Sequence, residues 1–332
     1  MSAAIRDVDP QRRDSDSPAA AIGRLAPSPT GAQHIGNART YLIAWLSIRS
    51  RGGKMIFRIE DIDSPRIKPG AADLLVEDLS WLGLNWDEGP VAQTARLSLY
   101  EDALKRLQTL ERVYPCTCTR SDVELAASAP HAEHEGPAYP GTCIHRRVAD
   151  ASGLAGKPFA WRFRAEGRVP AFDDGFRGQV TFHPRLTGGD FVVWKSAGTP
   201  AYQLAVVVDD AALGITEVIR GDDLIPSTPR QLLLYEALGL KPPRFIHLPL
   251  VVGTDGRRLA KRHGDTRLSS LRTAGVRPEA IIGLLAWSCG WLPRVESISA
   301  RDLLPLFRLE SIPPTPFVLV PSLLRQIGYR DS

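Results

Sequence analysis

Cysteine is scarce in this sequence, with four residues among 332, which is too few for a disulfide scaffold in a chain of this size. Long hydrophobic runs are also missing. No stretch of about 18 uncharged apolar residues occurs, so we expect no segment to span a membrane. The first 20 residues mix acids with bases and contain no apolar run, unlike a secretory signal. These absences favour a protein of the reducing cytoplasm.

Neither sign of charge dominates. There are 41 Lys and Arg residues against 37 Asp and Glu, a net charge of +4. This mild basic excess permits an RNA partner but does not require one. Apolar residues make up 43% and charged residues 23%, which is typical of a soluble globular protein and excludes a disordered or fibrous chain. The length suffices for one large domain or two smaller ones.

The order of elements near the N-terminus indicates a βαβ unit. Strands are expected over residues 21–26 and 54–59, with a helix over 36–49 between them and a second helix over 69–82. This order predicts an α/β fold with a parallel sheet and a right-handed crossover. Further helices are expected over 96–112, 229–238, 278–287 and about 299–307.

The second half of the chain alternates in character. Residues 115–158 are rich in Cys, Pro, Gly, Ala and His and suggest a loop-rich insertion. Residues 159–164 and 191–194 follow as alternating stretches. Residues 202–208 are nearly all apolar and predict a strand buried on both faces, and 245–252 predict another strand.

The first candidate site lies where the first strand meets the first helix. It comprises Pro27-Ser28-Pro29-Thr30-Gly31 and then His34-Ile35-Gly36-Asn37. A helix N-terminus offers unpaired N–H groups and a positive dipole end, which suits phosphate. Gly36 would let a nucleotide approach the backbone, and His34 can donate a hydrogen bond. The alternative is an ordinary strand–helix turn with a capping asparagine.

The second candidate is the basic segment from Arg257 to His263, which lies between glycines. Five cations within residues 257–267 suit a mobile clamp on polyphosphate. A solvated basic loop is the alternative.

The third candidate is a cluster of cysteines. Cys116 and Cys118 are followed, after a 20-residue gap, by Tyr139 and Cys143. Three thiolates and one further ligand make a closed tetrahedral zinc site, which suits a structural role. Tyr139 is an unusual ligand, and His131, His134 and His145 compete for the fourth place. Three unrelated reduced cysteines are the alternative, and Cys289 is expected to be a buried core thiol.

The fourth candidate is a set of residues expected at strand ends: Arg24, Glu60, Tyr202 and Arg220. Ligands of an open parallel sheet bind beyond the carboxyl ends of its strands. A ligand with two carboxylates and one ammonium needs cations and an anion together, and this set supplies both. Taken separately, each charge would more often be a surface ion pair.

Taken together, these segments resemble one family. The succession GRLAPSPTGAQHIGNART, FRIEDID, AYQLAVVVDD, EVIRGDDL and RLAKR is similar to the Rossmann-like catalytic core of class I glutamyl-tRNA synthetases, from about Gly23 to His263. The segment Pro27 to Asn37 corresponds to the HIGH signature, with Asn37 at its second histidine. Arg258 to Arg262 corresponds to the KMSKS signature, with Ala260 at its first serine.

Length then points to one branch of the family. About 70 residues follow Arg262, fewer than the helical anticodon-reading region of ordinary glutamyl-tRNA synthetases needs. The resemblance is therefore to the short glutamyl-Q tRNA(Asp) synthetases, whose zinc pattern also favours Tyr139 as the fourth ligand. That family activates glutamate with ATP, without tRNA, and transfers it to queuosine in the anticodon loop of tRNA(Asp).

The resemblance implies roles for individual residues. Arg24 and Arg220 would face the glutamate carboxylates beside Tyr202, Glu60 would hold the α-ammonium, and Leu25, Ala26, Pro27 and Ser28 would line the amino-acid site. Pro27, His34, Gly36 and Asn37 would cradle ATP, and Lys261 would contact its phosphates. His34 and Lys261 would be the catalytic residues, with Mg²⁺ beside ATP and one structural Zn²⁺ held by Cys116, Cys118, Tyr139 and Cys143.

The expected organisation follows from the same resemblance. It comprises a disordered tail (1–20), the first half of the catalytic domain (21–114), a zinc-binding insertion (115–158), the rest of the core (159–264) and a short helical C-terminal region without an anticodon-binding domain (265–332). We expect a cytoplasmic monomer. The alternatives are a truncated glutamyl-tRNA synthetase that charges a tRNA 3′ end, and an inactive zinc-containing RNA-binding module.

Overall fold

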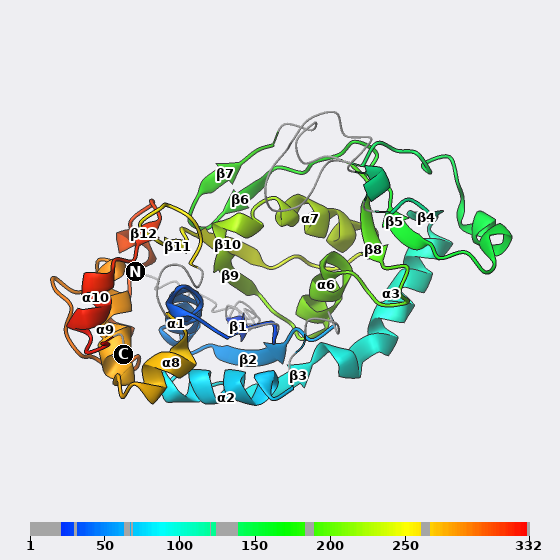
Figure 1. Ribbon diagram of the computed structural model, residues 1–332. Coiled ribbons are helices and arrows are strands. Elements are labelled where there is room, and N and C mark those ends of the chain that lie inside the picture. Colours follow the sequence, from blue (N-terminus) through cyan, green and yellow to red (C-terminus); the bar gives the residue numbers. More distant parts are fainter. Residues whose placement is uncertain are drawn as a thin grey trace, which may run out of the picture.

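The computed structural model describes residues 21–29, 32–62, 67, 69–119, 121–123, 139–182, 189–259 and 266–330. Its α-helices, labelled as in Figure 1, are α1 (Ile35–Arg49), α2 (Ala71–Trp81), α3 (Leu97–Thr109), α6 (Tyr202–Ala212), α7 (Ser227–Ala237), α8 (Leu268–Thr273), α9 (Pro278–Ser288) and α10 (Pro321–Gln326). Its strands are β1 (Ile22–Leu25), β2 (Lys54–Ile59), β3 (Glu88–Ala92), β4 (Val113–Cys116), β5 (Ala160–Phe163), β6 (Phe172–Asp174), β7 (Gly178–Val180), β8 (Phe191–Trp194), β9 (Glu217–Gly221), β10 (Arg244–Leu248), β11 (Val251–Val252) and β12 (Phe317–Val318). Short 3₁₀ helices span Gln93–Arg96, Val148–Leu154, Asp222–Leu224, Leu304–Leu306 and Leu309–Ser311.

Parallel strands form the centre of the molecule (Figure 1). β2 pairs with β1 on one side and β3 on the other, and β9 pairs with β10, all in parallel. The two sheets meet where the Thr216 amide donates to the Ile22 carbonyl oxygen at 2.9 Å. The strands therefore run in the order β3-β2-β1-β9-β10, with the order reversing between β1 and β9. This confirms the predicted α/β fold.

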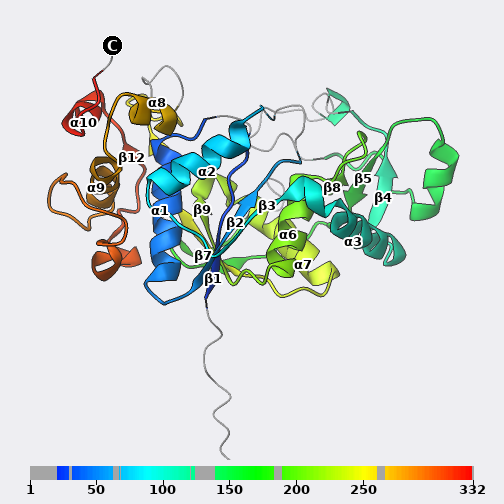
Figure 2. The same cartoon turned by 90° about the horizontal axis from the view of Figure 1, so that it is seen from below.

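Each face of the sheet has its own apolar core. Leu25, Met55 and Phe57 pack with α1 and α9, whereas Ile56 and Val218 pack with α6 and α7. Figure 2 shows α1 and α9 on one side of the strands and α6 and α7 on the other. Because successive residues of a strand point to opposite faces, the apolar residues Met55, Ile56 and Phe57 of β2 contribute to both cores in turn.

The prediction of a strand over residues 202–208 was wrong. This segment is the start of helix α6, which follows an extended Ala201 and is buried from Leu204 to Asp210. An apolar run packed against both a sheet and a neighbouring helix has no polar face, so periodicity cannot distinguish it from a buried strand. The two acids that end the run, Asp209 and Asp210, are buried among arginines and not exposed at a turn.

The expected helix over 299–307 was also wrong, because only Leu304–Leu306 is helical there, as a 3₁₀ turn. Pro305 lies inside this segment and cannot donate the backbone hydrogen bond that a longer helix would need. The other expected helices occur within a few residues of their predicted bounds.

A separate antiparallel sheet of β4, β5 and β8 lies at the end of the molecule away from α9 (Figure 2). β5 pairs antiparallel with both β4 and β8. β4 ends at Cys116, so this sheet carries the first residue of the cysteine cluster. No helix in the described part of the chain is long and apolar enough to cross a membrane.

Candidate active site

A pocket opens at the carboxyl edge of the parallel sheet, where the strand order reverses between β1 and β9. Its walls come from the ends of β1, β2 and β9, the start of α1 and α6, and the connection between β10 and β11. This is where ligands bind in open α/β sheets. Ten residues singled out from the sequence line it: Arg24, Ala26, His34, Gly36, Asn37, Glu60, Tyr202, Arg220, Arg258 and Leu259.

The remaining candidates lie elsewhere. Leu25 is fully buried in the core beside α1 and does not line the pocket. Pro27 and Ser28 continue the chain after β1, and the Pro27 carbonyl oxygen accepts from the Glu60 amide at 3.0 Å. Thr30, Gly31 and Ala260 to Arg262, including Lys261, lie outside the described residues.

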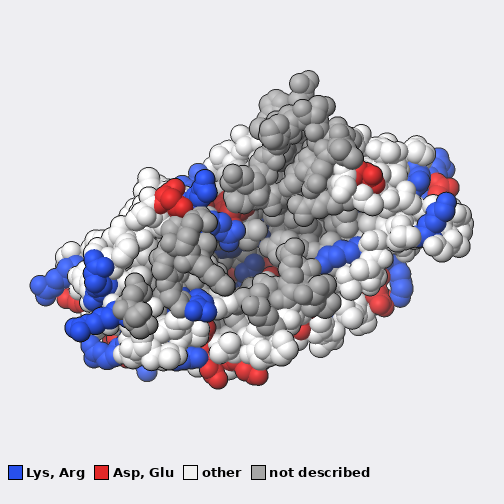
Figure 3. All heavy atoms as spheres, viewed as in Figure 1, with Lys and Arg blue, Asp and Glu red and all other residues white. Residues whose placement is uncertain are grey.

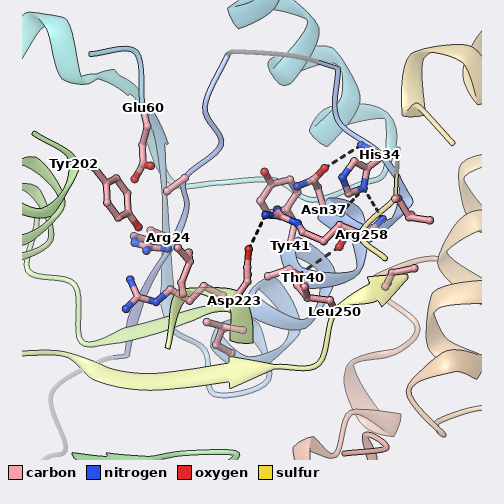
Figure 4. Close-up of a pocket in the computed structure, with 18 residues that line it drawn as sticks. Arg24, His34, Asn37, Thr40, Tyr41, Glu60, Tyr202, Asp223, Leu250 and Arg258 are labelled. Atoms are coloured by element: carbon pink, nitrogen blue, oxygen red, sulfur yellow. Dashed lines mark hydrogen bonds and ion pairs between the residues drawn. The ribbon is translucent and has the colours of Figure 1, made fainter. Parts of the chain in front are cut away.

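The two ends of the pocket differ in chemistry (Figure 4). Arg24, Glu60 and Tyr202 gather at one end, and His34, Asn37 and Thr40 at the start of α1 gather at the other. Arg220, on β9, lines the same pocket. One pocket therefore joins a group of charged side chains to a helix N-terminus.

His34 caps helix α1 with its own ring. Nδ1 accepts from the amides of Gly36 and Asn37 at 3.1 and 3.3 Å, and the Asn37 side chain accepts in return from the His34 amide at 3.1 Å. Burial, aided by the charge of Arg258, lowers the pKa of His34 to about 4. The ring is therefore neutral near pH 7 with its proton on Nε2, so it can donate to a ligand only through that atom.

This cap corrects the expectation of unpaired N–H groups at the start of α1. The Ile35 amide donates to the Thr266 carbonyl, and the next two amides donate to His34. The positive end of the helix dipole remains, but hydrogen bonds to an anion must come from side chains. His34 Nε2 is the donor that the cap leaves available.

Gly36 is required by the closeness of the His34 ring, not by backbone freedom. A Cβ atom at this position would lie 2.9 Å from His34 Cε1 and 3.3 Å from Val251 Cβ. Any larger residue would therefore displace the ring or the wall of the pocket.

A buried network of ion pairs holds the side chains at the charged end of the pocket. Arg24 Nε donates to Asp210 Oδ1 at 3.1 Å, and Arg58 donates to Asp210 at 2.6 Å and to Glu60 at 2.9 Å. Arg58 is fully buried and also lies 3.8 Å from Asp209. These contacts hold the Glu60 carboxyl group and the Arg24 guanidinium in place on adjacent walls of the pocket.

Sequence reasoning missed several residues of this site. Tyr41 and Thr40 line the pocket one turn along α1, as expected of positions i+3 and i+4 from Asn37. Asp223 pairs with Arg258 at 2.9 Å across the pocket (Figure 4). The acid pair in RGDDL was the available signal, because it directly follows the apolar run of β9 and ligands of an open parallel sheet bind beyond such strand ends.

The cysteine cluster lies apart from the pocket, beside β4. The sulfur atoms of Cys116, Cys118 and Cys143 lie within 4.8 Å of one another and could hold a metal ion. The Tyr139 hydroxyl lies 3.4 Å from the Cys116 sulfur and 3.8 Å from the Cys118 sulfur. His145 is exposed and not part of the group, and His131 and His134 lie outside the described residues.

The surroundings of Cys143 favour its thiolate, whereas burial raises the pKa of the Cys118 thiol. Burial works to raise the pKa of Cys143, but hydrogen bonds, first that from the Thr117 backbone and then that from Tyr139, lower it to about 7. Arg162 donates to the Cys116 sulfur at 3.2 Å and stacks over the Tyr139 ring at 3.8 Å. A cation at this distance stabilises negative charge on the sulfur ligands.

Comparison with known proteins defines the class. Residues 22–301 match the family described as tRNA synthetases class I (E and Q), catalytic domain. The chain therefore belongs to the class I tRNA synthetases with this catalytic domain, which use ATP.

Individual relatives narrow this further. The chain is 53% identical over 295 residues to the glutamyl-Q tRNA(Asp) synthetase of Rhodopirellula baltica, covering 85% of this chain and 89% of the relative. It is 50% identical to that of Symbiobacterium thermophilum, covering 89% and 94%. It is 43% identical to the glutamate–tRNA ligase of Geobacter sulfurreducens, over 92% of this chain but 65% of that one.

A solved structure agrees with these relatives. The glutamate tRNA ligase of Elizabethkingia meningosepticum, in complex with its amino acid, superposes with a TM-score of 0.79 at 26% identity, over 93% of this chain and 68% of that chain. The resemblance found in the sequence is thus confirmed. The protein is a ligase of the aminoacyl-tRNA synthetase type, and the relatives support glutamate–tRNA ligase-type activity.

Proposed function

We propose that this enzyme activates L-glutamate with ATP and transfers it to the queuosine base in the anticodon loop of tRNA(Asp). The observation that carries the proposal is the pocket that joins two arginines and one glutamate to the capped start of α1. An amino acid with two carboxylates and one ammonium complements the first group, and a nucleotide phosphate complements the second.

The roles at the charged end follow from charge. Arg24 and Arg220 bind the carboxylates of glutamate, and Glu60 accepts from its α-ammonium. Tyr202 lies between these groups at the start of α6, where Figure 4 shows it pointing toward Arg24 and Glu60. Leu25, Ala26, Pro27 and Ser28 support this wall from the end of β1.

The roles at the α1 end of the pocket follow from the hydrogen-bond donors and positive charges that lie there. The α-carboxylate of glutamate attacks the α-phosphorus of ATP in line, and pyrophosphate leaves. His34 donates from Nε2 to phosphate oxygens, and Gly36 and Asn37 hold its ring in place. Lys261 adds positive charge from the basic loop, and Mg²⁺ bound to ATP would neutralise further phosphate charge. Catalysis then rests on positioning and charge neutralisation, because the attacking carboxylate is already ionised.

We further propose that the cluster beside β4 holds one structural Zn²⁺. In a tetrahedron with Zn–S bonds of about 2.3 Å, ligand sulfurs lie about 3.8 Å apart. The sulfurs of Cys118 and Cys143 lie 3.7 Å apart. The Tyr139 hydroxyl would be the fourth ligand, and a bound ion would tie the 139–146 segment to β4.

The choice of acceptor rests on the relatives. The first three are named glutamyl-Q tRNA(Asp) synthetase, at 44–53% identity over 89–97% of their own length. Relatives named glutamate–tRNA ligase match at 43% and 42% over 65% and 61% of theirs. Both the anticodon loop and the acceptor end present a single-stranded tip on an A-form helix, so one pocket can serve either.

The decisive experiment has two arms. Glutamate-dependent ATP–pyrophosphate exchange without tRNA tests the activation step, and an inactive RNA-binding module would give none. Labelled glutamate is then offered with tRNA(Asp) that carries or lacks queuosine, and the product is digested to nucleosides. Label on the queuosine nucleoside supports the proposal.

A second candidate is charging of a tRNA 3′ end, favoured by the glutamate–tRNA ligase relatives. It predicts label on the terminal adenosine, equal charging of queuosine-free tRNA, and exchange that depends on tRNA.

The proposal also includes a cytoplasmic monomer and the division into 21–114, a zinc-binding insertion at 115–158, the remaining core at 159–264 and a helical region from 265.

A further inference from the structure

Arg220 is the last residue in a line of buried, hydrogen-bonded polar side chains. Asp174, at the end of β6, lies with Oδ2 2.7 Å from Nδ1 of His247 on β10, and both side chains are fully buried. On the other side of the ring, His247 Nε2 lies 2.9 Å from Arg220 Nε. β6, β10 and β9 thus contribute one residue each to a continuous line that ends at the pocket.

The donor and acceptor roles in this line of hydrogen bonds are fixed. Asp174 Oδ1 accepts from the amides of Phe176, Arg177 and His247, which keeps the carboxylate ionised and acceptor-only. His247 must therefore carry its proton on Nδ1 and present the lone pair of Nε2 to Arg220. A proton on Nε2 would face the Arg220 N–H as donor against donor.

The guanidinium of Arg220 is held at two of its three nitrogens. Nε donates to His247, and Nη2 donates to Thr228 and Gln231, each at 2.8 Å. The Thr228 hydroxyl, having accepted from Arg220, can donate to His247 Nε2 at 3.2 Å. Nη1 is buried and has no hydrogen-bond partner among the described residues, and Arg220 lines the pocket.

We propose that Asp174 and His247 are positioning residues that aim Nη1 of Arg220 at a substrate carboxylate and so make the pocket select a carboxylate over an amide. The inference deepens the proposed function, on which it rests. A carboxylate offers acceptors only and matches the two donors of Nη1. An amide of the same shape places an NH₂ group against one of the arginines, which leaves buried donors unpaired. Discrimination therefore requires that Arg220 cannot rotate to relieve the mismatch.

Two substitutions of His247 separate its two hydrogen bonds. The Asn in His247→Asn can place its NH₂ near Nδ1 and keep the bond to Asp174, but it has no atom at Nε2. The Gln in His247→Gln can place an oxygen near Nε2 and keep the acceptor for Arg220. We expect His247→Asn to raise the KM for glutamate roughly tenfold or more, as for loss of a hydrogen bond to a charged group. The KM for ATP should stay within about twofold, and the preference for glutamate over glutamine should fall roughly tenfold.

His247→Gln should restore most of the glutamate affinity. Thr228→Val, which keeps the shape of a buried residue that touches both His247 and Arg220, gives a milder test if either His247 variant fails to fold. It should also raise the KM for glutamate and not that for ATP. Ser47→Ala is the matched control, since it removes a buried hydrogen bond to Glu217, three residues before Arg220 on the same strand. It should lower the melting temperature without changing the KM for glutamate.

The outcomes are distinct. Absence of glutamate-dependent exchange in the wild-type enzyme contradicts the proposed function itself. Normal exchange in the wild type, with His247→Asn and Thr228→Val unchanged in glutamate affinity and selectivity, overturns the positioning role. Equal losses for glutamate and ATP in step with melting temperature, as in a purely structural role, overturn it as well.

Discussion

Arg24 on the first strand donates from Nε to Oδ1 of Asp210 in helix α6, at 3.1 Å across 186 positions of sequence. The same oxygen accepts from Arg58 at 2.6 Å. Burial works to raise the pKa of Asp210, but the charges of Arg58 and Arg24 hold it below its usual range. One buried carboxylate thus compensates two buried cations beneath the pocket.

Asp210→Asn should strongly destabilise the protein. It removes a buried charge that pairs with both Arg24 and Arg58, and breaking a buried pair costs about 3–5 kcal/mol. Urea unfolding would measure the loss. Glu88→Gln breaks an ion pair with Lys54 in which both side chains are nearly half exposed, and should cost less than about 1 kcal/mol. Similar losses for the two variants would contradict a special role for Asp210.

Gly36→Ala should impair ATP use more than glutamate binding. The new methyl group would lie 3.0 Å or less from two atoms of the His34 ring, so the ring and its Nε2 donor must shift. We expect the KM for ATP in pyrophosphate exchange to rise roughly tenfold, since small misplacements of catalytic groups are costly. Gly153→Ala faces open space and provides the control. An unchanged KM for ATP would remove His34 from the phosphate site.

The His34 ring should make stability depend on pH in a defined direction. Burial lowers its pKa from 6.5 to about 4 in the folded state. Between these values the unfolded chain binds a proton that the folded protein does not, so stability falls as pH falls through this window. In His34→Gln the free energy of unfolding should decline less from pH 7 to pH 4 than in the wild type. Parallel curves for the two proteins would show that the pKa of His34 is the same in the folded and unfolded states.

Zinc content should depend on the cluster and on no other cysteine. Purified protein should contain one zinc per chain, and Cys118→Ser should lower this and loosen the segment around residues 139–146 more than the core. Hydrogen exchange of that segment and metal analysis would measure both effects.

Two further variants refine the zinc test. Tyr139→Phe keeps the three thiolates and removes the fourth donor, so it should weaken retention of zinc against a chelator. Cys289, buried outside the cluster, serves as the control in Cys289→Ala. Full zinc retention in Cys118→Ser would refute the assignment.

The sequence predicted much of the fold because its strongest signals are local. The βαβ unit, the helices and the cysteine cluster each follow from spacing or from turn residues within one segment. Helix α6 was mistaken for a strand because both states bury an apolar run completely. Tyr202 nonetheless lines the pocket, since the N-terminus of a helix and the end of a strand can reach the same edge.

The connections within the site were not predictable in the same way. Asp174, His247 and Thr228 carry no motif, and their line behind Arg220 exists only because β6, β9 and β10 pack together. The sequence also did not predict that the first amides of α1 are already hydrogen-bonded. His34 can accept from the Gly36 and Asn37 amides only in one side-chain rotamer, which the sequence does not reveal. Pairings over long sequence separations leave no local pattern.

The space-filling view shows the hollow of the pocket with charged side chains in its floor (Figure 3). Its walls are assembled late along the chain, since β1 lies between β2 and β9 and the latter begins almost 200 residues after β1. A chain emerging from the ribosome would hold Arg24 and Arg58 without Asp210 until α6 is made, and the pocket would lack Arg220 until β9 follows. Substrates stabilise only states that already contain their site. Neither glutamate nor ATP can therefore assist early folding, and the half-built sheet must be protected by its own apolar contacts or by chaperones.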